Sequence, residues 1–332
     1  MDKNHPDVQF GRTGVLIVNL GTPDSFGWWD IRKYLKEFLS DRRVIEVNPI
    51  IWQIVLNLFI LTFRPSKTAH AYKKIWRKES NESPLLYFTK QQSQKLNKKI
   101  GNENVIVDFA MRYGNPSIKS KLDVMKEKGC ENIIVLPLYP QYAAATTATV
   151  CDEIYRSLMR MRWQPSLQII PHYESDPLYI DALINSIEKK ISEIDWKPDL
   201  IISSYHGIPK SYFDKGDPYH CYCRKTTRLM QEKFNKVEIQ TTFQSRFGPQ
   251  EWLTPYTDKT LEKLPGEGIK NLLVICPGFA SDCVETLEEI NIQGKETFIQ
   301  NGGKNFESVP CLNDNIDHIL LFEHLIKKYL II

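Results

Sequence analysis

Apolar runs of strand length recur along this sequence, and a stretch with helical spacing follows most of them. The runs are short and continuously apolar, which is typical of parallel strands covered on both faces. The predicted strands are 13–19, 104–111, 132–138, 167–170, 200–205, 237–243 and 271–276, and the predicted helices are 117–128, 143–161, 177–194, 223–234, 256–264, 281–292 and 315–330. This alternation predicts an α/β fold.

The number of alternations fits two doubly wound parallel-sheet units. We expect the first to cover residues 1–165 and the second 166–314, with a terminal helix at 315–332 that packs back on the first unit. A chain of 332 residues is long enough for two hydrophobic cores. Because ligands of open α/β sheets bind beyond the carboxyl ends of the strands, we expect the ligand in a cleft between the units.

Residues 50–63 form an unusually apolar segment, which Gln53 and Asn57 interrupt. Fourteen residues are too few to cross the hydrocarbon core of a bilayer, which is about 30 Å thick. Two interpretations stay open, a buried core helix or an exposed lip that touches a membrane or admits an apolar ligand. The flanking basic residues, which suit anionic lipid, are Arg42, Arg43, Arg64 and Lys67.

Composition and charge narrow the partners and the compartment. The formal net charge is only +3 and no basic tract occurs, so nucleic acid is not an expected partner. Seven scattered cysteines argue against a disulfide framework, and the polar amino terminus resembles neither a signal nor a transit peptide, which together favour the cytoplasm. Neither a Gly-x-Gly-x-x-Gly motif nor a P-loop occurs, so no nucleotide or other organic cofactor is expected.

His206 is the first candidate for chemistry. It follows the predicted strand 200–205, and Gly207 and Pro209 then make a tight turn. A histidine that caps this turn would be purely structural. Its position at the carboxyl end of a strand favours a functional role.

Three carboxylates form the second candidate. Asp282, Glu285 and Glu289 would share one face of an α-helix, and no Lys or Arg lies between them to balance the charge. The helix dipole explains Asp282 but not Glu289, whereas an acidic ladder that binds cations or relays protons explains all three. Carboxylates with an imidazole suit Fe²⁺, and the absence of a zinc-type ligand pattern predicts a metal held only weakly, as a substrate is.

The motif His220-Cys221-Tyr222-Cys223 could ligate a metal or part of a [2Fe–2S] cluster. A cluster needs four ligands, so the others would have to come from positions such as Cys151 or Cys283. Ordinary free thiols are the favoured interpretation.

Several motifs match the ferrochelatase family in order along most of the chain. They are Asn19-Leu20-Gly21-Thr22-Pro23, Ser83-Pro84-Leu85, Met111-Arg112-Tyr113, Pro137-Leu138-Tyr139-Pro140-Gln141-Tyr142, His206-Gly207-Ile208-Pro209, Gly216-Asp217-Pro218-Tyr219, Phe243-Gln244-Ser245-Arg246 with Trp252-Leu253, and Asp282-Cys283-Val284-Glu285-Thr286-Leu287. The sequence resembles that family, which implies two Rossmann-like domains with a porphyrin cleft between them. It also implies a lyase that inserts Fe²⁺ into protoporphyrin IX, forms protohaem and releases two protons, the last step of haem synthesis.

The resemblance also implies roles for individual residues. His206 and Glu285 match the catalytic pair at the metal, and Asp282 and Glu289 continue a path for protons or metal. Which of His206 and Glu285 takes the pyrrole protons stays open. The residues that match contacts to the macrocycle are Leu20, Arg64, Tyr72, Ser83, Arg112, Tyr113, Trp252 and Phe279.

The apolar segment 50–63 matches the active-site lip of the family, which favours peripheral contact with the cytoplasmic face of a membrane. Leu20 stands where relatives that use coproporphyrin have a tyrosine, which favours protoporphyrin. Two alternatives remain, a related sirohaem- or cobalt-type chelatase and a non-catalytic carrier of tetrapyrrole or metal. A carrier would need affinity but no base such as His206.

Overall fold

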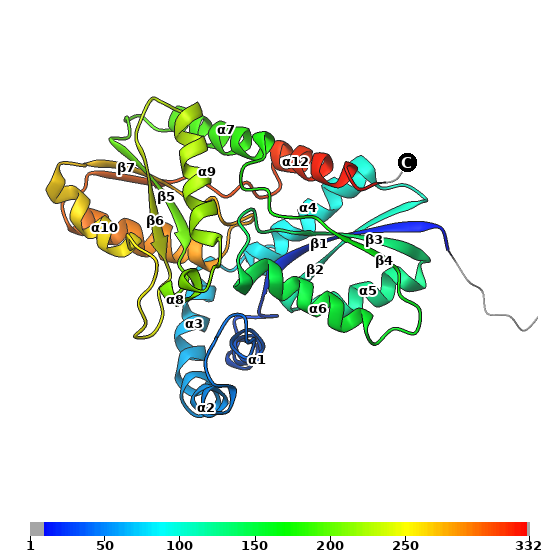
Figure 1. Cartoon of the computed structure of the whole chain (residues 1–332). Helices are drawn as coiled ribbons and strands as arrows, with labels where there is room; N and C mark the ends of the chain where they lie inside the picture. The colour runs from blue at the N-terminus through cyan, green and yellow to red at the C-terminus, as the bar shows by residue number, and fades with distance from the viewer. Residues whose placement is uncertain (1–9, 331–332) are drawn as a thin grey trace, which may run out of the picture.

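The computed structural model describes residues 10–330, which form two four-stranded parallel sheets side by side (Figure 1). The first sheet has the order β2-β1-β3-β4 and the second the order β6-β5-β7-β8. The strands are β1 (Arg12–Thr22), β2 (Val105–Gly114), β3 (Cys130–Pro137), β4 (Ser166–Ile169), β5 (Leu200–His206), β6 (Ile239–Gln244), β7 (Asn271–Ile275) and β8 (Asn305–Ser308). The prediction of an α/β fold with two parallel-sheet units is confirmed.

Helices cover both sheets. The α-helices are α1 (Trp28–Leu39), α2 (Pro49–Val55), α3 (Leu61–Ile75), α4 (Pro84–Ile100), α5 (Ile118–Glu127), α6 (Thr149–Leu158), α7 (Pro177–Glu193), α8 (Lys210–Asp214), α9 (Tyr219–Lys233), α10 (Thr257–Lys263), α11 (Lys295–Gln300) and α12 (Ile316–Lys327). Three segments are π-helical, η1 (Leu56–Ile60), η2 (Ala144–Ala148) and η4 (Glu285–Gly294), and η3 (Leu264–Glu267) is a 3₁₀ turn. The apolar pattern did not predict α1, α4, α8, α11 or β8.

Helix α4 escaped the pattern because its buried face is partly polar. Thr89, Gln92 and Ser93 are buried there among the apolar residues, so the helical period is interrupted in the sequence. Its start nevertheless follows a standard rule, since the Ser83 hydroxyl caps the Leu86 amide at 3.2 Å and Pro84 takes the first helical position.

The two sheets are joined by a hydrophobic cluster that they share, and each also has a buried cluster of its own. Val15 and Ile134 of the first sheet lie in the same buried cluster as Ile201 and Leu273 of the second, and Phe322 of α12 completes it. Helix α12 packs against both α4 and α7, at the top of Figure 1. It therefore joins the two halves, whereas the prediction placed it on the first half alone. The predicted boundary after residue 165 also falls one strand too early, because β4 pairs with β3 in the first sheet.

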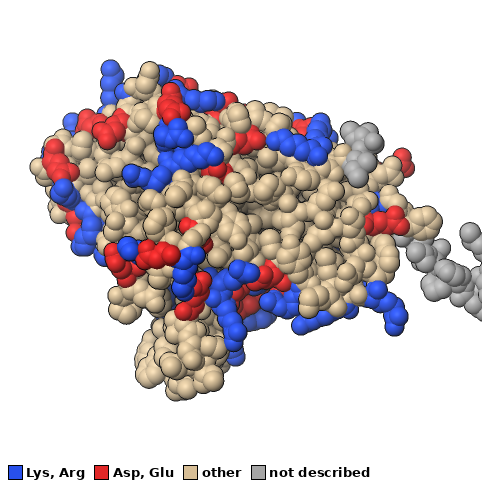
Figure 2. All heavy atoms as spheres, viewed as in Figure 1, with Lys and Arg blue, Asp and Glu red and all other residues tan. Residues whose placement is uncertain are grey.

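The apolar segment lies on an exposed protrusion. Helix α2, η1 and the start of α3 project below the sheets in Figure 1, and Figure 2 shows this protrusion almost free of charged side chains, with both basic and acidic side chains beside its base. Ile50, Leu58 and Phe63 are 73%, 63% and 74% exposed, although Leu56 is fully buried. This exposure decides against a buried core helix.

The helix that carries the apolar run is longer than the run itself. Among residues 10–330, Pro49–Ile75 is the one segment of 27 residues long and apolar enough to cross a membrane by length and composition. Its second half, however, packs against α1 and η4 and carries the buried Tyr72. The segment is therefore attached to the body of the protein along much of its length.

Candidate active site

His206 is the last residue of β5, and its ring is held by the turn that follows. Its Nδ1 lies 2.6 Å from the Gly207 carbonyl oxygen. Because a carbonyl only accepts, Nδ1 donates and Nε2 is left as the acceptor of a neutral ring. A Cβ at Gly207 would come within 3.1 Å of both the Gln244 carbonyl and the Trp252 ring, so any larger residue would push one of these neighbours aside by a few tenths of an ångström.

Glu289 is fixed against the end of the neighbouring strand. Its carboxylate accepts the Ser245 backbone amide at 2.7 Å, the Ser245 hydroxyl, and the Gln244 amide at 3.3 Å. Burial raises the pKa of Glu289; the Ser245 hydrogen bond and His206 oppose this rise, and the charge of Glu285 adds to it. His206, Glu285 and Glu289 therefore interact at one end of the second sheet.

Glu285 is the first residue of η4, and its charge influences titratable groups in the first half of the molecule. Its charge raises the pKa of the buried tyrosines Tyr34 and Tyr72, for which burial is the larger cause. It also opposes the lowering of the Arg64 pKa that burial produces. Glu285 thus faces α1 and α3, whereas Glu289 is bound to β6.

The acidic helix differs from the α-helix that its spacing predicted. From Glu285 to Gly294 it is π-helical, with hydrogen bonds from each residue to the fifth along the chain. Glu285 and Glu289 belong to this segment, but Asp282 precedes it. Both oxygens of Asp282 accept hydrogen bonds inside the protein, from Thr286, Cys311 and Asn313. Asp282 is therefore anchored rather than aligned with the other two acids.

Arg64 lies at the base of the protrusion, and its set of hydrogen-bond partners is incomplete. Its guanidinium stacks on the Phe247 ring, 4.3 Å from the centroid, and its buried Nη1 has no hydrogen-bond partner. A buried donor without an acceptor costs about 1–3 kcal/mol. The arrangement is suited to receiving an anionic group of a ligand.

A cavity of about 400 Å³ is lined in part by Glu289. Gln244, Ser245 and Gln293 contribute to its lining, together with Lys67 and Arg246. It opens a route from the buried carboxylate towards solvent.

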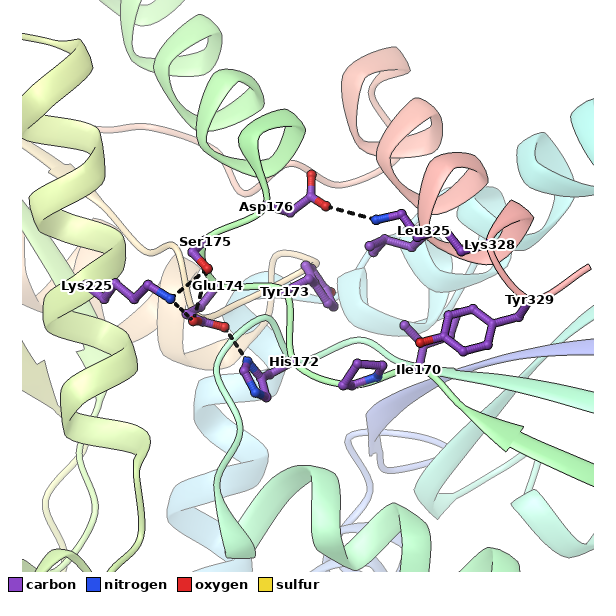
Figure 3. Close-up of a pocket in the computed structure, with 11 residues that line it drawn as sticks. Ile170, His172, Tyr173, Glu174, Ser175, Asp176, Lys225, Leu325, Lys328 and Tyr329 are labelled. Carbon is purple, nitrogen blue, oxygen red and sulfur yellow. Dashed lines mark hydrogen bonds and ion pairs between the residues drawn. The ribbon is translucent and has the colours of Figure 1, made fainter.

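A second cavity, of about 260 Å³, lies where the chain crosses from β4 to α7 (Figure 3). The buried Glu174 is paired with His172 at 2.6 Å and Lys225 at 2.9 Å, and Asp176 lies 3.6 Å from Lys328. Its acids are thus matched by bases from α9 and α12, which ties the connection between the halves to both helices.

The comparisons with known proteins agree with this architecture. The family described as Ferrochelatase matches residues 12–330. The ferrochelatase of Allorhizobium ampelinum is 53% identical over 333 residues, 99% of this chain and 97% of the relative. That of Rhizobium meliloti is 52% identical over 335 residues, 99% of each chain. This chain belongs to the ferrochelatase family. It is therefore an enzyme that inserts Fe²⁺ into a porphyrin in haem synthesis.

Solved structures share the fold of this ferrochelatase at much lower identity. SirB from Bacillus subtilis with Fe³⁺ superposes with a TM-score of 0.59 at 12% identity and covers 96% of this chain and 95% of its own. CbiX, described as the terminal enzyme for biosynthesis of siroheme in denitrifying bacteria, gives 0.53 at 13% identity and covers 96% and 99%. Such identities show the fold alone, so the sirohaem- or cobalt-type alternative is not favoured.

Three residues expected to touch the macrocycle of this ferrochelatase make contacts within the protein. Arg112 pairs with Asp41 at 2.5 Å and donates to the Thr149 carbonyl, and the fully buried Tyr113 donates to the same Asp41 at 2.9 Å. Ser83 is buried as the cap of α4. Asp41 lies in a connection without periodic pattern, so the sequence held no signal for it.

The other expected contacts are differently placed. Leu20, Trp252 and Phe279 are half-buried near the ends of β1, β6 and β7. Trp252 comes closest to the reacting end, with its ring centroid 6.5 Å from that of His206. These half-buried apolar groups suit the wall of a flat ligand.

Metal ligation in the ferrochelatase is sparse. Among residues 10–330, no three His, Cys, Asp or Glu side chains form a group that could hold a metal ion. The hypothesis of a [2Fe–2S] cluster gains no third ligand, since Cys221 is exposed on α9 and Cys223 is buried in an apolar cluster. Neither Cys151 nor Cys283 joins them in such a group.

Proposed function

We propose that this ferrochelatase works in the cytoplasm on protoporphyrin IX, with His206 and Glu285 at the Fe²⁺ ion and the pyrrole nitrogens. The observation that carries the proposal is the attachment of Glu285 and Glu289 to Gln244 and Ser245 at the carboxyl end of β6, beside His206 at the end of β5. In open α/β sheets this edge is where ligands bind. Asp282 was expected to continue the acidic path, and its contacts favour a different role.

The reaction requires two N–H protons to leave the porphyrin as Fe²⁺ enters. A flat macrocycle hides its nitrogen lone pairs, and a cleft that distorts the ring exposes them at a cost of about 1–5 kcal/mol, which remote binding energy offsets. Because Nδ1 donates to the Gly207 carbonyl, Nε2 is the nitrogen of His206 that can accept a pyrrole proton. Glu285 also belongs to the second half but faces α1 and α3 of the first, and it balances the charge of the ion.

Glu289 continues this path away from the porphyrin. Burial raises its pKa, so it accepts and releases a proton more readily near neutral pH than an ordinary carboxyl group does. The cavity of about 400 Å³ on its outer side gives protons a way out, or the metal a way in. Each turnover converts protoporphyrin and Fe²⁺ into protohaem and two protons. The path therefore needs to carry only protons outward and Fe²⁺ inward.

Binding of the macrocycle falls to other residues. The unpaired Nη1 of Arg64 is suited to a propionate, and Leu20, Tyr72, Trp252 and Phe279 supply apolar contact. Because these groups touch parts of the porphyrin that do not react, they contribute to affinity more than to turnover.

The test is a comparison of binding and turnover. His206→Ala and Glu285→Ala are expected to bind protoporphyrin, measured by fluorescence, within about threefold of the parent, while multiple-turnover insertion of Fe²⁺ under anaerobic conditions falls about 100-fold or more. Trp252→Ala should show the reverse, weaker binding with a smaller loss of turnover. A His206→Ala protein that keeps most of its turnover at pH 7–8 would show that His206 only caps its turn.

We further propose that the protrusion formed by α2, η1 and the start of α3 contacts a membrane surface peripherally. Its exposed Ile50, Ile54, Leu58 and Phe63 can enter the interface, and Arg42 and Lys67 near its base suit anionic headgroups. The inner half of α3 remains packed on η4, which favours a surface contact over a span. Such a contact would bring an apolar porphyrin to the cleft from the bilayer.

A further inference from the structure

Asn313 occupies a junction of three parts of the molecule. It lies between β8 and α12, is buried, and has a left-handed backbone with φ +46°. Asparagine is one of the few residues with a side chain that adopts this conformation at little cost. Its side chain and its backbone carbonyl bind different elements.

The side chain of Asn313 holds Asp282 at two points. Its Nδ2 donates to Asp282 Oδ2 at 2.6 Å, and its Oδ1 accepts the Asp282 backbone amide at 2.8 Å. The other carboxylate oxygen of Asp282 accepts from the Thr286 hydroxyl at 3.0 Å and the Cys311 amide at 3.3 Å. A buried network that is satisfied in this way is rigid. It fixes the residue three positions before Glu285.

The carbonyl of Asn313 joins this clamp to the rest of the protein. It accepts from Gln92 of α4 at 2.8 Å and from Nδ1 of His318 in α12 at 2.7 Å. Burial lowers the pKa of His318 to about 4, so its ring is neutral at physiological pH and Nδ1 is the donor. Gln92 also donates to the Ala280 carbonyl and the Ser281 hydroxyl, immediately before Asp282.

We infer that Asn313 is a positioning residue for Fe²⁺ insertion, which acts through Asp282 to fix the first turn of η4, and that Asp282 is an anchor rather than a carrier of protons or metal. The inference rests on the roles proposed above for Glu285 and Glu289. Both acids belong to η4, so the clamp at Asp282 sets where they stand relative to His206. A misplacement of about 1 Å at a reacting group can cost about 100-fold in rate.

An exchange of the two residues tests whether Asp282 is an anchor or a carrier of protons or metal. In Asp282→Asn the new NH2 group must face another donor, either the Asn313 Nδ2 or the Cys311 amide, so one hydrogen bond of the network is lost. In Asn313→Asp two carboxylates face each other, and the hydrogen bond between the side chains is lost. In the double variant Asp282→Asn, Asn313→Asp the amide at 282 donates to the carboxylate at 313. Every other acceptor of the network is still an oxygen, and Asp also tolerates the left-handed backbone.

The expected result is rescue of turnover. Each single variant should lower kcat about tenfold or more while protoporphyrin binding stays within about threefold, and the exchange should restore kcat to within about threefold of the parent. An exchanged protein that folds, binds porphyrin and stays as slow as Asp282→Asn would overturn the inference, because residue 282 would then need its charge or proton. Asn313→Gly, which keeps the backbone conformation and removes only the clamp, should also lower kcat.

A matched control excludes a general loss of stability. Asn315 caps α12 by accepting the His318 amide at 2.8 Å and does not touch Asp282. Asn315→Ala should lower the stability, as the loss of a helix cap does, and leave kcat unchanged. An equal loss of kcat in Asn315→Ala and Asn313→Gly would contradict a specific role for Asn313. Glu285→Ala, measured in parallel, reports separately on the proposed function, since retained turnover there would refute the role of Glu285 whatever the exchange shows.

Discussion

Ser245 holds Glu289 through two donors, its backbone amide at 2.7 Å and its hydroxyl, and its own backbone adopts φ +64°. A residue with a side chain rarely takes this conformation, and residues that do so cluster at functional sites. The turn after β6 thus directs both donors at one buried acid. This contact keeps the carboxylate in place even though burial favours its protonated form.

Replacement of Glu289 by Gln should stabilise the protein and slow it. Because the pKa of Glu289 is raised in the folded state, the folded protein keeps a proton that the unfolded chain has released at the same pH. The free energy of unfolding therefore falls as pH rises above the ordinary carboxyl range. Glu289→Gln should be more stable than the parent by about 0.5–2 kcal/mol at pH 8 and equally stable near pH 4, measured by urea unfolding. A variant less stable at pH 8 would show that the Ser245 contacts outweigh burial.

Arg64→Ala should weaken substrate binding with little effect on folding. Its Nη1 has no partner in the protein, so removal of the side chain breaks no hydrogen bond there. The KM for protoporphyrin should rise about tenfold, kcat should change less than about threefold, and the free energy of unfolding should change by less than about 1 kcal/mol. Arg246→Ala is the control, because Arg246 is already paired with Asp258 and its loss should leave KM unchanged.

Asp41→Ala should destabilise the protein strongly. The Asp41 and Arg112 side chains are 11% and 7% exposed, so the change strands a buried cation and also removes the acceptor of Tyr113. The expected loss in the free energy of unfolding is about 3–5 kcal/mol. Asp258→Ala breaks the exposed pair with Arg246 and should cost less than about 1 kcal/mol. Equal losses in the free energy of unfolding of the two variants, measured by chemical denaturation, would show that the buried pair stabilises the protein no more than the exposed pair does.

Membrane contact should depend on the exposed face of the protrusion. Changing Ile54, Leu58 and Phe63 together to Ser removes apolar groups that are 55–74% exposed and should leave the fold intact. Co-sedimentation with vesicles that contain anionic phospholipid should fall severalfold, since binding follows buried apolar area. The control changes Met159 and Ile316, which are equally exposed elsewhere, to Ser. Binding that is lost in the control as well, or in neither, would refute a specific surface.

The sequence predicted the parts of this protein that depend on local pattern. Apolar runs marked seven of the eight strands, and β8 was missed because in its four residues only Phe306 is buried. The turn after His206 could be found because Gly207 and Pro209 are recognisable next to a strand.

What the sequence did not predict depends on contacts between distant segments. The link from Asn313 to Asp282 spans 31 positions, and the pairing of Arg112 with Asp41 spans 71. The π-helical winding of η4 also escaped, because the spacing of its acids fits an α-helix equally well. Roles of this kind follow from packing, which one residue's neighbours in sequence do not determine.

The identical strand order of the two sheets has a consequence for how such an enzyme can change. Leu20, Arg64 and Tyr72 come from the first sheet and its helices, whereas His206, Glu285 and Glu289 all come from the second. In the proposed mechanism the reactive groups thus come from one copy of the architecture, whereas the macrocycle contacts come from both, since Trp252 and Phe279 also belong to the second. Substitutions that alter the shape of the substrate pocket can accumulate in the first copy while the proton-moving groups keep their geometry in the second.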